Sequence, residues 1–310
     1  MQTMIFLAIL QALVLTAVAP LFSGLSRVLR AKMHSRRGPG LLQDYRDLIK
    51  LLKRQDVATA DSGPIFRLMP YVLFGSMLAI ATVLPLVTTR SPLGAAGDLI
   101  TVVYLFALAR FFFSLSGLDT GSTFGAIGAS RELTLGVLVE PIMMLALFVA
   151  ALIEGTTNLG GIGLGIATGH YVSPTAIALA GAAFGFAAFI EMGKLPFDMA
   201  EAEQELQEGP LTEYSGSALA LVKWGLALKK LVVAQMFLGV FLPFGQASEL
   251  TAAALAVAIV AAALKLLVVF LLSALVENGM ARGRFMLTSK VTWIGFGVAS
   301  LAFVFYLTGL

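Results

Sequence analysis

The 310-residue chain has no cysteine and only two histidines, His34 and His170. Without cysteine, it can form no disulfide bond, no thiolate zinc site and no cysteine-bound iron–sulfur cluster. Both histidines lie outside the long apolar segments, so they cannot hold a haem there. If the protein takes part in redox chemistry, the redox centres must belong to another subunit. We expect no metal site and no cofactor in this chain.

Charged residues are also scarce. Asp, Glu, Lys and Arg make up 13% of the chain, whereas a soluble globular protein has about 25%. Hydrophobic residues make up 58% and lie in long blocks. This composition nearly excludes a water-soluble protein of this length and predicts a membrane protein.

Eight segments reach the roughly 20 mostly apolar residues that a transmembrane helix needs. We therefore predict an all-α, polytopic membrane protein with a single integral membrane domain over residues 1–310. The first segment lacks the basic start and the cleavage site of a signal peptide, so we expect it to remain as a helix. The predicted spans are Met4–Phe22, Leu68–Thr89, Leu99–Leu118, Leu133–Ile153, Pro174–Lys194, Ser217–Phe244, Leu250–Val276 and Val291–Leu310.

Lysine and arginine predict the orientation of the spans, because cytoplasmic loops of membrane proteins are enriched in both. The connection after the first span carries ten of them, and the only one on the opposite side is Arg90. We predict that the odd-numbered connections face the cytoplasm and that both termini lie outside. The later odd-numbered connections contribute Arg131, Lys194, Arg282, Arg284 and Lys290.

The first cytoplasmic connection, residues 23–67, contains an amphipathic segment. From Leu41 to Gln55, apolar residues recur at helical spacing and charged residues occupy the other face. Such a helix can lie among lipid headgroups, with its bases attracted to anionic lipid. It can equally form a ledge that docks a cytoplasmic partner. On the opposite side, we expect the glycine-rich connection 154–173 to be a flexible loop.

Charges inside the spans are the main functional signal, because each costs at least about 2.5–3.5 kcal/mol. We expect Lys194 and Glu277, at span ends, to form ion pairs or reach the interface. For Glu140, Glu191 and Lys265 we favour a functional role. Other charges at or within the spans are Arg110, Glu132, Lys223, Lys229 and Lys230. Lys223 and Lys230 are seven residues apart and so share one face of span six, whereas Lys229 lies on another face.

The connection over residues 195–216 is acidic, against the basic bias of its side of the membrane. As a helix from Pro196, it would place Asp198, Glu201, Glu205 and Glu208 on one stripe and Glu203 away from it. Closely packed carboxylates hold some protons near neutral pH. The segment is therefore a candidate proton relay or electrostatic switch, or only a docking surface.

Two classes of function fit these features: an ion- or proton-coupling subunit of a larger complex, and a free-standing secondary transporter. A transporter would need a substrate site at broken helices near the midplane. Only Pro141 lies in the middle of a span. The basic and acidic connections fit binding to a protein better.

The run Glu191-x-x-Lys-x-Pro-Phe-Asp-x-x-Glu-x-Glu-x-Glu-Leu, continuing to Glu213-Tyr-x-Gly216, resembles the signature of the H subunit of respiratory complex I. The family also includes the large membrane anchor of membrane-bound NiFe-hydrogenases. Arg36-Arg37-Gly-Pro and Gly128-Ala-x-Arg131, followed by Glu140, are similar to other family motifs.

Departures from complex I resemble the formate hydrogenlyase branch. They include a short Gly38-Pro-Gly-Leu41 junction, Lys194 in place of an arginine, and three lysines in span six. Two stretches, 33–40 and 201–216, are most similar to the hydrogenase-4 type of membrane subunit, with the formate hydrogenlyase-1 type as a near alternative. A quinone-site subunit of complex I remains a further alternative.

The resemblance implies a subunit without redox centres in the bacterial inner membrane. Its partners would be the NiFe-hydrogenase large subunit, the iron–sulfur small subunit, antiporter-like membrane subunits and a formate dehydrogenase module, together with the lipid bilayer and no nucleic acid. The Ni–Fe centre and the iron–sulfur clusters would lie on those partners.

The acid spacing and the resemblance together predict two groups of residues. For proton or ion coupling they are Glu132, Glu140, Glu191, Asp198, Glu201, Glu203, Glu205, Glu208, Glu213, Lys223, Lys230 and Lys265. For docking of the cytoplasmic arm they are Arg36, Arg37, Arg46, Arg131, Lys194, Arg282 and Arg284.

Overall fold

The computed structural model describes residues 2–89, 91–94, 96–169, 173–249 and 251–309. Over these ranges the chain forms helices joined by turns and two isolated β-bridges, with no strand. Eight helices there are long and apolar enough to cross a membrane, which confirms the predicted fold class. They are α1 (Gln2–Met33), α3 (Pro64–Val83), α4 (Leu99–Asp119), α5 (Thr123–Glu154), α7 (Pro174–Glu191), α9 (Gly216–Phe241), α10 (Ala252–Gly279) and α11 (Phe285–Thr308).

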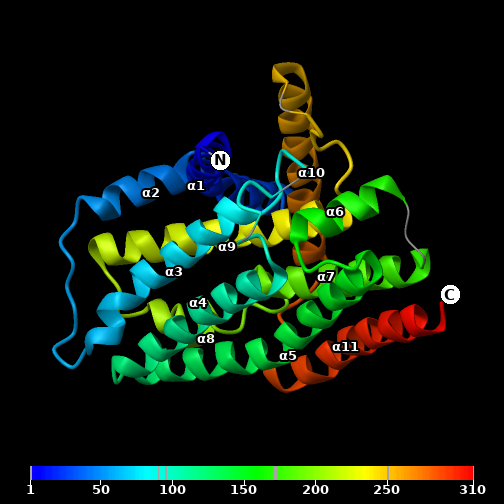
Figure 1. Ribbon diagram of the computed structural model, residues 1–310. Coiled ribbons are helices and arrows are strands. Elements are labelled where there is room, and N and C mark those ends of the chain that lie inside the picture. The colour runs from blue at the N-terminus through cyan, green and yellow to red at the C-terminus, as the bar shows by residue number, and fades with distance from the viewer. Residues whose placement is uncertain (1, 90, 95, 170–172, 250, 310) are drawn as a thin grey trace.

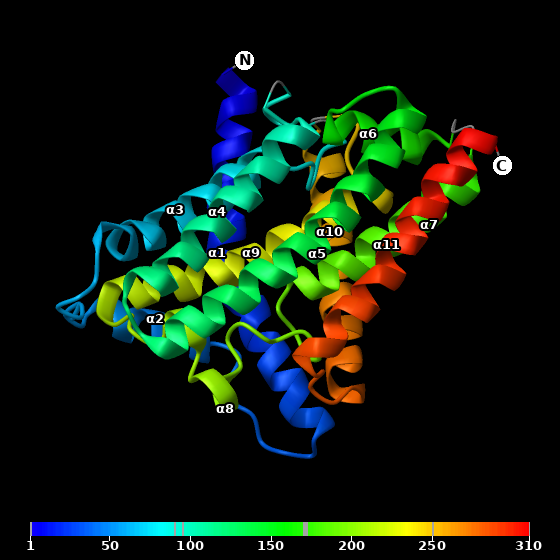
Figure 2. The ribbon, with the colours of Figure 1, turned by 90° about the horizontal axis from the view of Figure 1, so that it is seen from below.

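Successive long helices run in opposite directions, so alternate connections gather at opposite ends of the bundle (Figure 1, Figure 2). One end carries α2 (Gln43–Leu52), α8 (Glu203–Leu206) and the α4–α5 connection. The other carries α6 (Leu159–Thr168) and the C-terminus. These are called the α2 end and the α6 end below.

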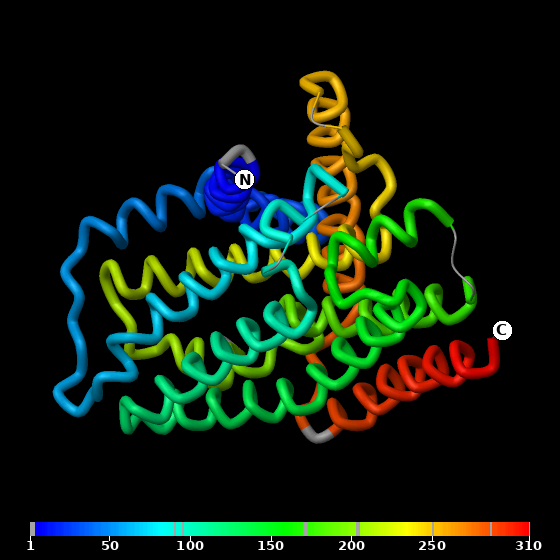
Figure 3. The backbone as a smooth tube through the Cα atoms, viewed as in Figure 1, coloured from blue at the N-terminus to red at the C-terminus, as the bar shows by residue number. Residues whose placement is uncertain are grey.

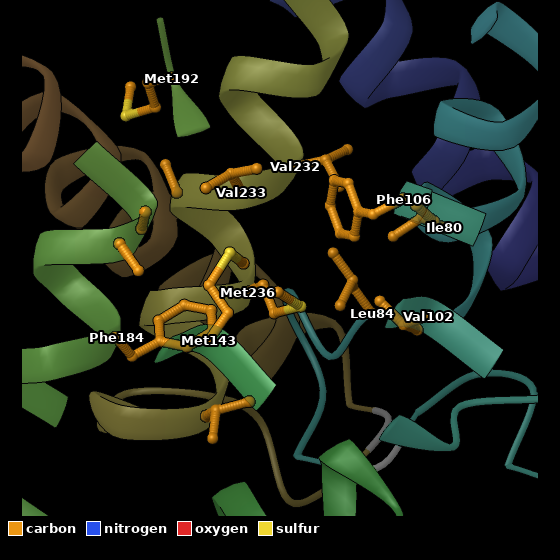
Figure 4. Packing of buried hydrophobic residues seen from close by; sticks show 14 of the residues in the cluster. Ile80, Leu84, Val102, Phe106, Met143, Phe184, Met192, Val232, Val233 and Met236 are labelled. Carbon is orange, nitrogen blue, oxygen red and sulfur yellow. The ribbon is translucent and has the colours of Figure 1, made fainter. Parts of the chain in front are cut away.

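Helix α9 is the centre of the bundle and packs against α1, α3, α6 and α7. Figure 4 shows its side chains Val232, Val233 and Met236 between those of α7 on one side and those of α3 and α4 on the other. The path of the chain in Figure 3 shows α10 crossing the other long helices steeply. Helices α10 and α11 keep most of their apolar surface exposed, whereas α9 buries most of its own.

Side-chain oxygens satisfy the free N–H groups at the start of several helices. Asp98 accepts a hydrogen bond from the N–H of Ile100 at the start of α4. At α9 the cap comes from a distant segment, because Asp56 accepts hydrogen bonds from the N–H of Ala218 and the hydroxyl of Ser217. The chain after α2 is thereby tied to the central helix.

Helix α1 continues eleven residues beyond its predicted end at Phe22, so the first part of the expected loop 23–67 is helical. Its last turns form ion pairs with neighbouring helices, Arg27 with Asp44 and Arg30 with Glu277. Helix α2 confirms the predicted amphipathic helix, with Leu48 buried and Ile49 exposed.

The expectation of a flexible loop over 154–173 is wrong, because α6 occupies residues 159–168. Asn158 caps this helix by accepting a hydrogen bond from the N–H of Gly161. Its apolar residues Leu159, Ile162 and Ile166 are buried at helical spacing, and Gly163 lets the helix approach the backbone carbonyl of Gly239 in α9. Burial and a cap therefore outweigh the low helix propensity of glycine.

The continuous helix expected from Pro196 to Glu208 is also wrong. Only residues 203–206 are α-helical, followed by a 3₁₀ turn over Gly209–Leu211. Phe197 and Met199 bury their side chains two residues apart, while Asp198 between them pairs with Arg282. This alternation suits an extended chain, so the predicted acidic stripe does not form.

Candidate functional site: a buried ion cluster

Five charged side chains from four helices meet inside the bundle, and we call this group the ion cluster. Arg110 comes from α4, Glu132 and Glu140 from α5, Glu191 from α7 and Lys229 from α9. The Arg110 side chain is only 8% exposed. Charges in a span are costly unless they pair with one another, and here each carboxylate has a basic partner.

Arg110 is the centre of the ion cluster because its guanidinium contacts all three carboxylates. Its Nη1 lies 2.5 Å from Glu140 Oε1, and its Nε lies 3.4 Å from Glu132 Oε1. Its Nη2 binds Glu191 Oε2. The planar fork of an arginine, with five N–H donors, allows one side chain to bridge several carboxylates.

A glycine makes room for this bridge. Glu132, Gly136 and Glu140 are spaced four residues apart and so lie on one face of α5. A Cβ atom at Gly136 would come within 2.6 Å of Arg110 Cδ and 2.7 Å of its Nη1. The missing side chain therefore lets Arg110 lie across α5 and reach the carboxylates on either side.

Lys229 is the second cation of the ion cluster. Its Nζ lies 2.8 Å from Glu191 Oε1 and 3.8 Å from Glu132 Oε1. Lys223 and Lys230 were the predicted coupling residues of this helix, and Lys229 was placed on another face; it is Lys229 that pairs with the acids of this cluster. Lys223 instead pairs with Glu208 at 3.6 Å.

Lys265, expected to partner the acids within the membrane, lies at the α6 end. Its ammonium donates to the backbone carbonyls of Leu242 and Phe244 at 2.8 and 2.9 Å. These carbonyls follow the last turn of α9, where a cation is favourable because helix C-terminal carbonyls lack partners. Lys265 therefore has a structural partner there.

The acidic segment 195–216 meets the ion cluster at a small cavity of about 50 Å³. Arg110, Glu132, Glu191 and Lys229 line it from the cluster, and Asp198, Glu201 and Lys230 line it from the α2 end. A cavity of this size holds one or two water molecules. It brings the predicted loop acids within reach of the buried ones.

A larger cavity of about 630 Å³, the chamber, lies at the α2 end between α1, α2, α9 and α10. Asp198, Glu201 and Lys230 line both cavities, so these three side chains lie between the chamber and the ion cluster. Burial raises the pKa of Glu201, and the carboxylates of Asp198 and Glu132 act in the same direction, while Lys230 opposes them.

Lys194 lies in the chamber wall, with its side chain 6% exposed. Its ammonium is 3.5 Å from Glu277 and 3.2 Å from the hydroxyl of Ser26. Burial lowers its pKa to about 8; Glu277 opposes this shift and Lys230 adds to it. Of the two outcomes expected for these span-end charges, an ion pair or a place at the interface, the structure shows the ion pair. Lys194 is buried, which does not fit its expected place on a docking surface.

The other predicted residues lie around the α2 end. Arg131 pairs with Glu205 at 2.7 Å, and Arg282 pairs with Asp198 at 3.2 Å. Glu213 is half-buried, and the side chain of Glu203 lies outside the described part of the structure. Of the bases predicted to dock the cytoplasmic arm, Arg36, Arg37, Arg46 and Arg284 are exposed.

The profile of a protein family described as NADH dehydrogenase matches residues 5–308. This chain belongs to that family. The match covers all eight long helices and both charged connections, so the whole bundle is the family's fold and the resemblance seen in the motifs is confirmed.

Two relatives within the family match nearly the full chain. "Hydrogenase-4 component C" of Escherichia coli (strain K12) is 59% identical over 307 residues, which cover 99% of this chain and 97% of that protein. "Formate hydrogenlyase subunit 4" of the same strain is 60% identical over 296 residues, 96% of each protein. An NADH-quinone oxidoreductase subunit of Cytophaga hutchinsonii is more distant, with 32% identity over 260 residues, 71% of this chain and 70% of that one.

A solved structure of the same architecture is a chain of the "membrane-bound sulfane sulfur reductase (MBS), an archaeal respiratory membrane complex". It aligns with a TM-score of 0.85 and 25% identity, covering 97% of this chain and 99% of that chain. The same fold thus occurs in a chain of an archaeal respiratory membrane complex.

Sequence reasoning missed two members of the ion cluster as site residues, Arg110 and Lys229. The signal for Arg110 was present, because it is the one charge in the middle of span three and faces the Glu-x-x-x-Gly-x-x-x-Glu spacing in span four. Helical phase separates Lys229 from Lys223 and Lys230, but it does not say which face of α9 meets α5 and α7.

Proposed function

We propose that this chain is the membrane subunit of a formate hydrogenlyase complex of the hydrogenase-4 kind. In this role it anchors the cytoplasmic NiFe-hydrogenase arm and couples formate oxidation and proton reduction to ion translocation through its buried carboxylates. The observation that carries the proposal is the ion cluster, joined through Glu201 to a chamber beside the connecting segments. The near full-length identity to two hydrogenase membrane subunits supports it.

The proposed orientation places the α2 end in the cytoplasm of a bacterium and both termini outside its inner membrane. The docking surface then comprises α2, the α4–α5 connection and the acidic segment, with exposed bases and the Arg131–Glu205 pair. The proposed arm consists of the NiFe-hydrogenase large subunit and the iron–sulfur small subunit, with a formate dehydrogenase module beyond them. The Ni–Fe centre and the clusters belong to those partners, since this chain has no cysteine.

Coupling in this proposal runs from the acidic segment into the bundle. A change of charge at the docking surface alters the protonation of Glu201, and the small cavity connects Glu201 to Glu132 and Glu191. Glu140 lies deepest on α5, and its side chain is 33% exposed on the side of the bundle. A carboxylate exposed to lipid is costly, so we propose that an antiporter-like membrane subunit covers it.

The test is a pair of variants in the assembled complex. Glu140→Gln and Glu201→Gln should lower coupled ion movement by about 100-fold, while the hydrogenase arm still co-purifies with the membrane subunit. The matched control is Glu249→Gln, on the connection at the α6 end, which should leave coupling unchanged. Normal coupling in both test variants would refute the route, and failure of a NiFe subunit to co-purify with the wild-type chain would refute the anchor role.

Cross-linking tests the orientation separately. Single cysteines at exposed Arg37, Arg46 and Arg284 should cross-link to the hydrogenase arm, because the chain has no other cysteine to compete. A cysteine at exposed Phe244, near the α6 end, is the matched control and should not. Cross-links to the arm from the control position alone would reverse the topology.

The distant relatives named as NADH-quinone oxidoreductase subunits favour a second candidate, a quinone-reducing subunit. A quinone bound in the chamber would meet charged walls, because twelve of its 23 lining residues are charged, and an apolar tail gains nothing from such walls. The expected result is that the purified complex does not reduce a short-chain quinone analogue. Rapid reduction that is abolished by Leu226→Trp in the chamber wall would favour the second candidate.

A further inference from the structure

Lys194 is a buried amine that opens onto the chamber. It follows the end of α7, and its side chain is only 6% exposed in the chamber wall. Its Nζ lies 3.2 Å from the hydroxyl of Ser26 on α1, 3.5 Å from Glu277 on α10, and 5.6 Å from the centre of the Phe270 ring. The proposed coupling route makes no use of this group.

The charges around Lys194 are unbalanced. Arg30 pairs with the same carboxylate, Glu277, at 3.4 Å. Lys230 in the chamber wall is a further cation whose charge opposes that of Lys194, and it forms no ion pair within the described ranges. Three cations and one carboxylate therefore meet here, with a net charge of +2.

The other acids of the chamber do not remove this surplus. Burial favours the neutral form of Glu201. Lys50 lines the chamber without an ion pair to any described residue and adds to the positive charge. The remaining acids have bases of their own: Asp198 pairs with Arg282, Glu208 with Lys223, and Asp44 and Asp47 with Arg27.

This environment favours the neutral amine of Lys194. Burial lowers its pKa from 10.5 to about 8; Glu277 opposes the shift, whereas Lys230 and Arg30 add to it. The neutral form is then about 300-fold more abundant at pH 7 than in an ordinary lysine. A lysine amine that is desolvated and close to other cations is a nucleophile for carbonyl carbon.

We propose that Lys194 is a carbamylation site for carbon dioxide. The proposal rests on the proposed function, because the oxidation of formate releases carbon dioxide in the same complex. The lone pair of Nζ adds to the carbon of carbon dioxide, so an N–C bond forms and one C–O π bond opens onto its oxygen. One N–H proton leaves to water, and no electron is gained or lost overall. The product is a carbamate with a charge of −1.

The surrounding groups suit this product. Carbamylation changes Lys194 from a cation to an anion, and the net charge of the four side chains falls from +2 to 0. Lys230 and Arg30 become counter-charges, and the Ser26 hydroxyl is placed to donate a hydrogen bond. The modified wall also lines the chamber beside Glu201. The reaction product would thus regulate the coupling route.

Other lysines of the bundle are not equivalent. The ammonium of Lys229 is held by two carboxylates, and that of Lys265 donates to two backbone carbonyls. Lys53, which follows α2, is exposed to solvent. These three lysines serve as internal controls within one sample.

The test labels the assembled complex with ¹³C-bicarbonate and carbon dioxide at pH 8. A trialkyloxonium salt then converts carbamates to stable esters, and mass spectrometry of the digest locates the label. The ester should lie on Lys194 and be absent from the three control lysines. It should be lost in Lys194→Arg, since arginine keeps its proton, and reduced in Lys230→Met but retained in Lys230→Arg. A label missing from Lys194, found on Lys230 instead, or equally strong on Lys53 would overturn the proposal.

Formate tests the source of the carbon dioxide. With ¹³C-formate as the only carbon source, the ester on Lys194 should carry the label. At constant pH, added carbon dioxide should slow coupled ion movement in the wild type, and this response should be lost in Lys194→Arg. Hydrogen evolution from formate without any ester would overturn the inference and leave the proposed function in place. An ester formed from added carbon dioxide, in a complex that does not oxidise formate, would support the site and refute the proposed function.

Discussion

The two ends of the bundle bury polar groups in different ways. Towards the α2 end, the ion cluster uses full charges from four helices. Towards the α6 end, neutral amides bind the carbonyls at the end of α3: Gln11 donates to those of Ala81 and Leu84 at 2.8 Å, and Gln235 donates to that of Pro85 at 2.8 Å. These carbonyls lie where α3 ends, and in a membrane each needs a partner. At this end Lys265 also donates to the carbonyls that follow α9.

The difference distinguishes polar groups that are buried to complete the fold from polar groups that are buried to serve a function. An amide satisfies a free carbonyl without any counter-charge, so a broken helix end needs nothing more than glutamine. Charges are far more costly to bury and require one another. A chain that satisfies the end of α3 with amides therefore has no packing reason to bury five charges elsewhere, and the ion cluster demands a functional explanation.

We expect the largest loss of stability in Arg110→Leu, because this variant leaves three carboxylates with a single cation. Removing one partner of a buried ion pair costs about 3–5 kcal/mol, and we expect a loss of this size in the free energy of unfolding of the solubilised complex. Arg110→Lys keeps the charge but not the fork, so it should recover only part of the stability. If Arg110→Leu were as stable as the wild type, the charged groups towards the α2 end would contribute no more to stability than the amides towards the α6 end.

The pH dependence of stability tests the burial of Lys194 at the α2 end. Because its pKa is about 8 in the folded protein and 10.5 when unfolded, the unfolded state binds more protons between these values. Stability should therefore rise with pH from about 8 to 10.5, by about 3 kcal/mol in total. When denaturation midpoints are plotted against pH over this range, the slope should be shallower in Lys194→Met and in Lys194→Arg than in the wild type. Equal slopes would contradict the buried ammonium.

Much of the fold follows from hydropathy, because 20-residue apolar blocks in a membrane have few alternatives to a helix. The segments that were predicted wrongly lie outside those blocks. Helix α6 is rich in glycine and is held by tertiary burial, and the acidic segment follows its buried Phe197 and Met199 instead of its charge spacing. Both depend on contacts with distant helices, which local patterns do not contain.

The sequence predicted the acidic residues of the site more completely than its basic residues. Four predicted coupling acids lie close together: Glu132, Glu140 and Glu191 contact Arg110, and Glu201 lines the cavity beside them. Which of the three lysines on α9 meets the acids depends on how that helix is rotated about its axis relative to α5 and α7. Only the three-dimensional packing supplies that rotation, and it selects Lys229.

The amide end should respond more weakly to mutation. Gln235→Met keeps the length of the side chain but removes the donor to the carbonyl of Pro85, and we expect a loss of about 1 kcal/mol in the free energy of unfolding. The loss should be independent of pH and of salt, because no charge is involved. Coupled ion movement should stay at the wild-type level. A large coupling defect would mean that the α6 end is also part of the ion route.

The smallest effect is expected where charge is exposed, at the Arg131–Glu205 pair. Glu205 is 52% exposed on its side chain, and Glu205→Gln should change the free energy of unfolding by less than about 1 kcal/mol, an effect that salt screens. The hydrogen bond from Arg131 lowers the pKa of Glu205, so this small contribution is present above the unfolded pKa and is lost as the pH falls through the folded one. Denaturation of wild type and variant at low and high salt measures both. A loss as large as that of Arg110→Leu would show that burial does not set the strength of charge pairing in this protein, and the contrast between its two ends would then need another cause.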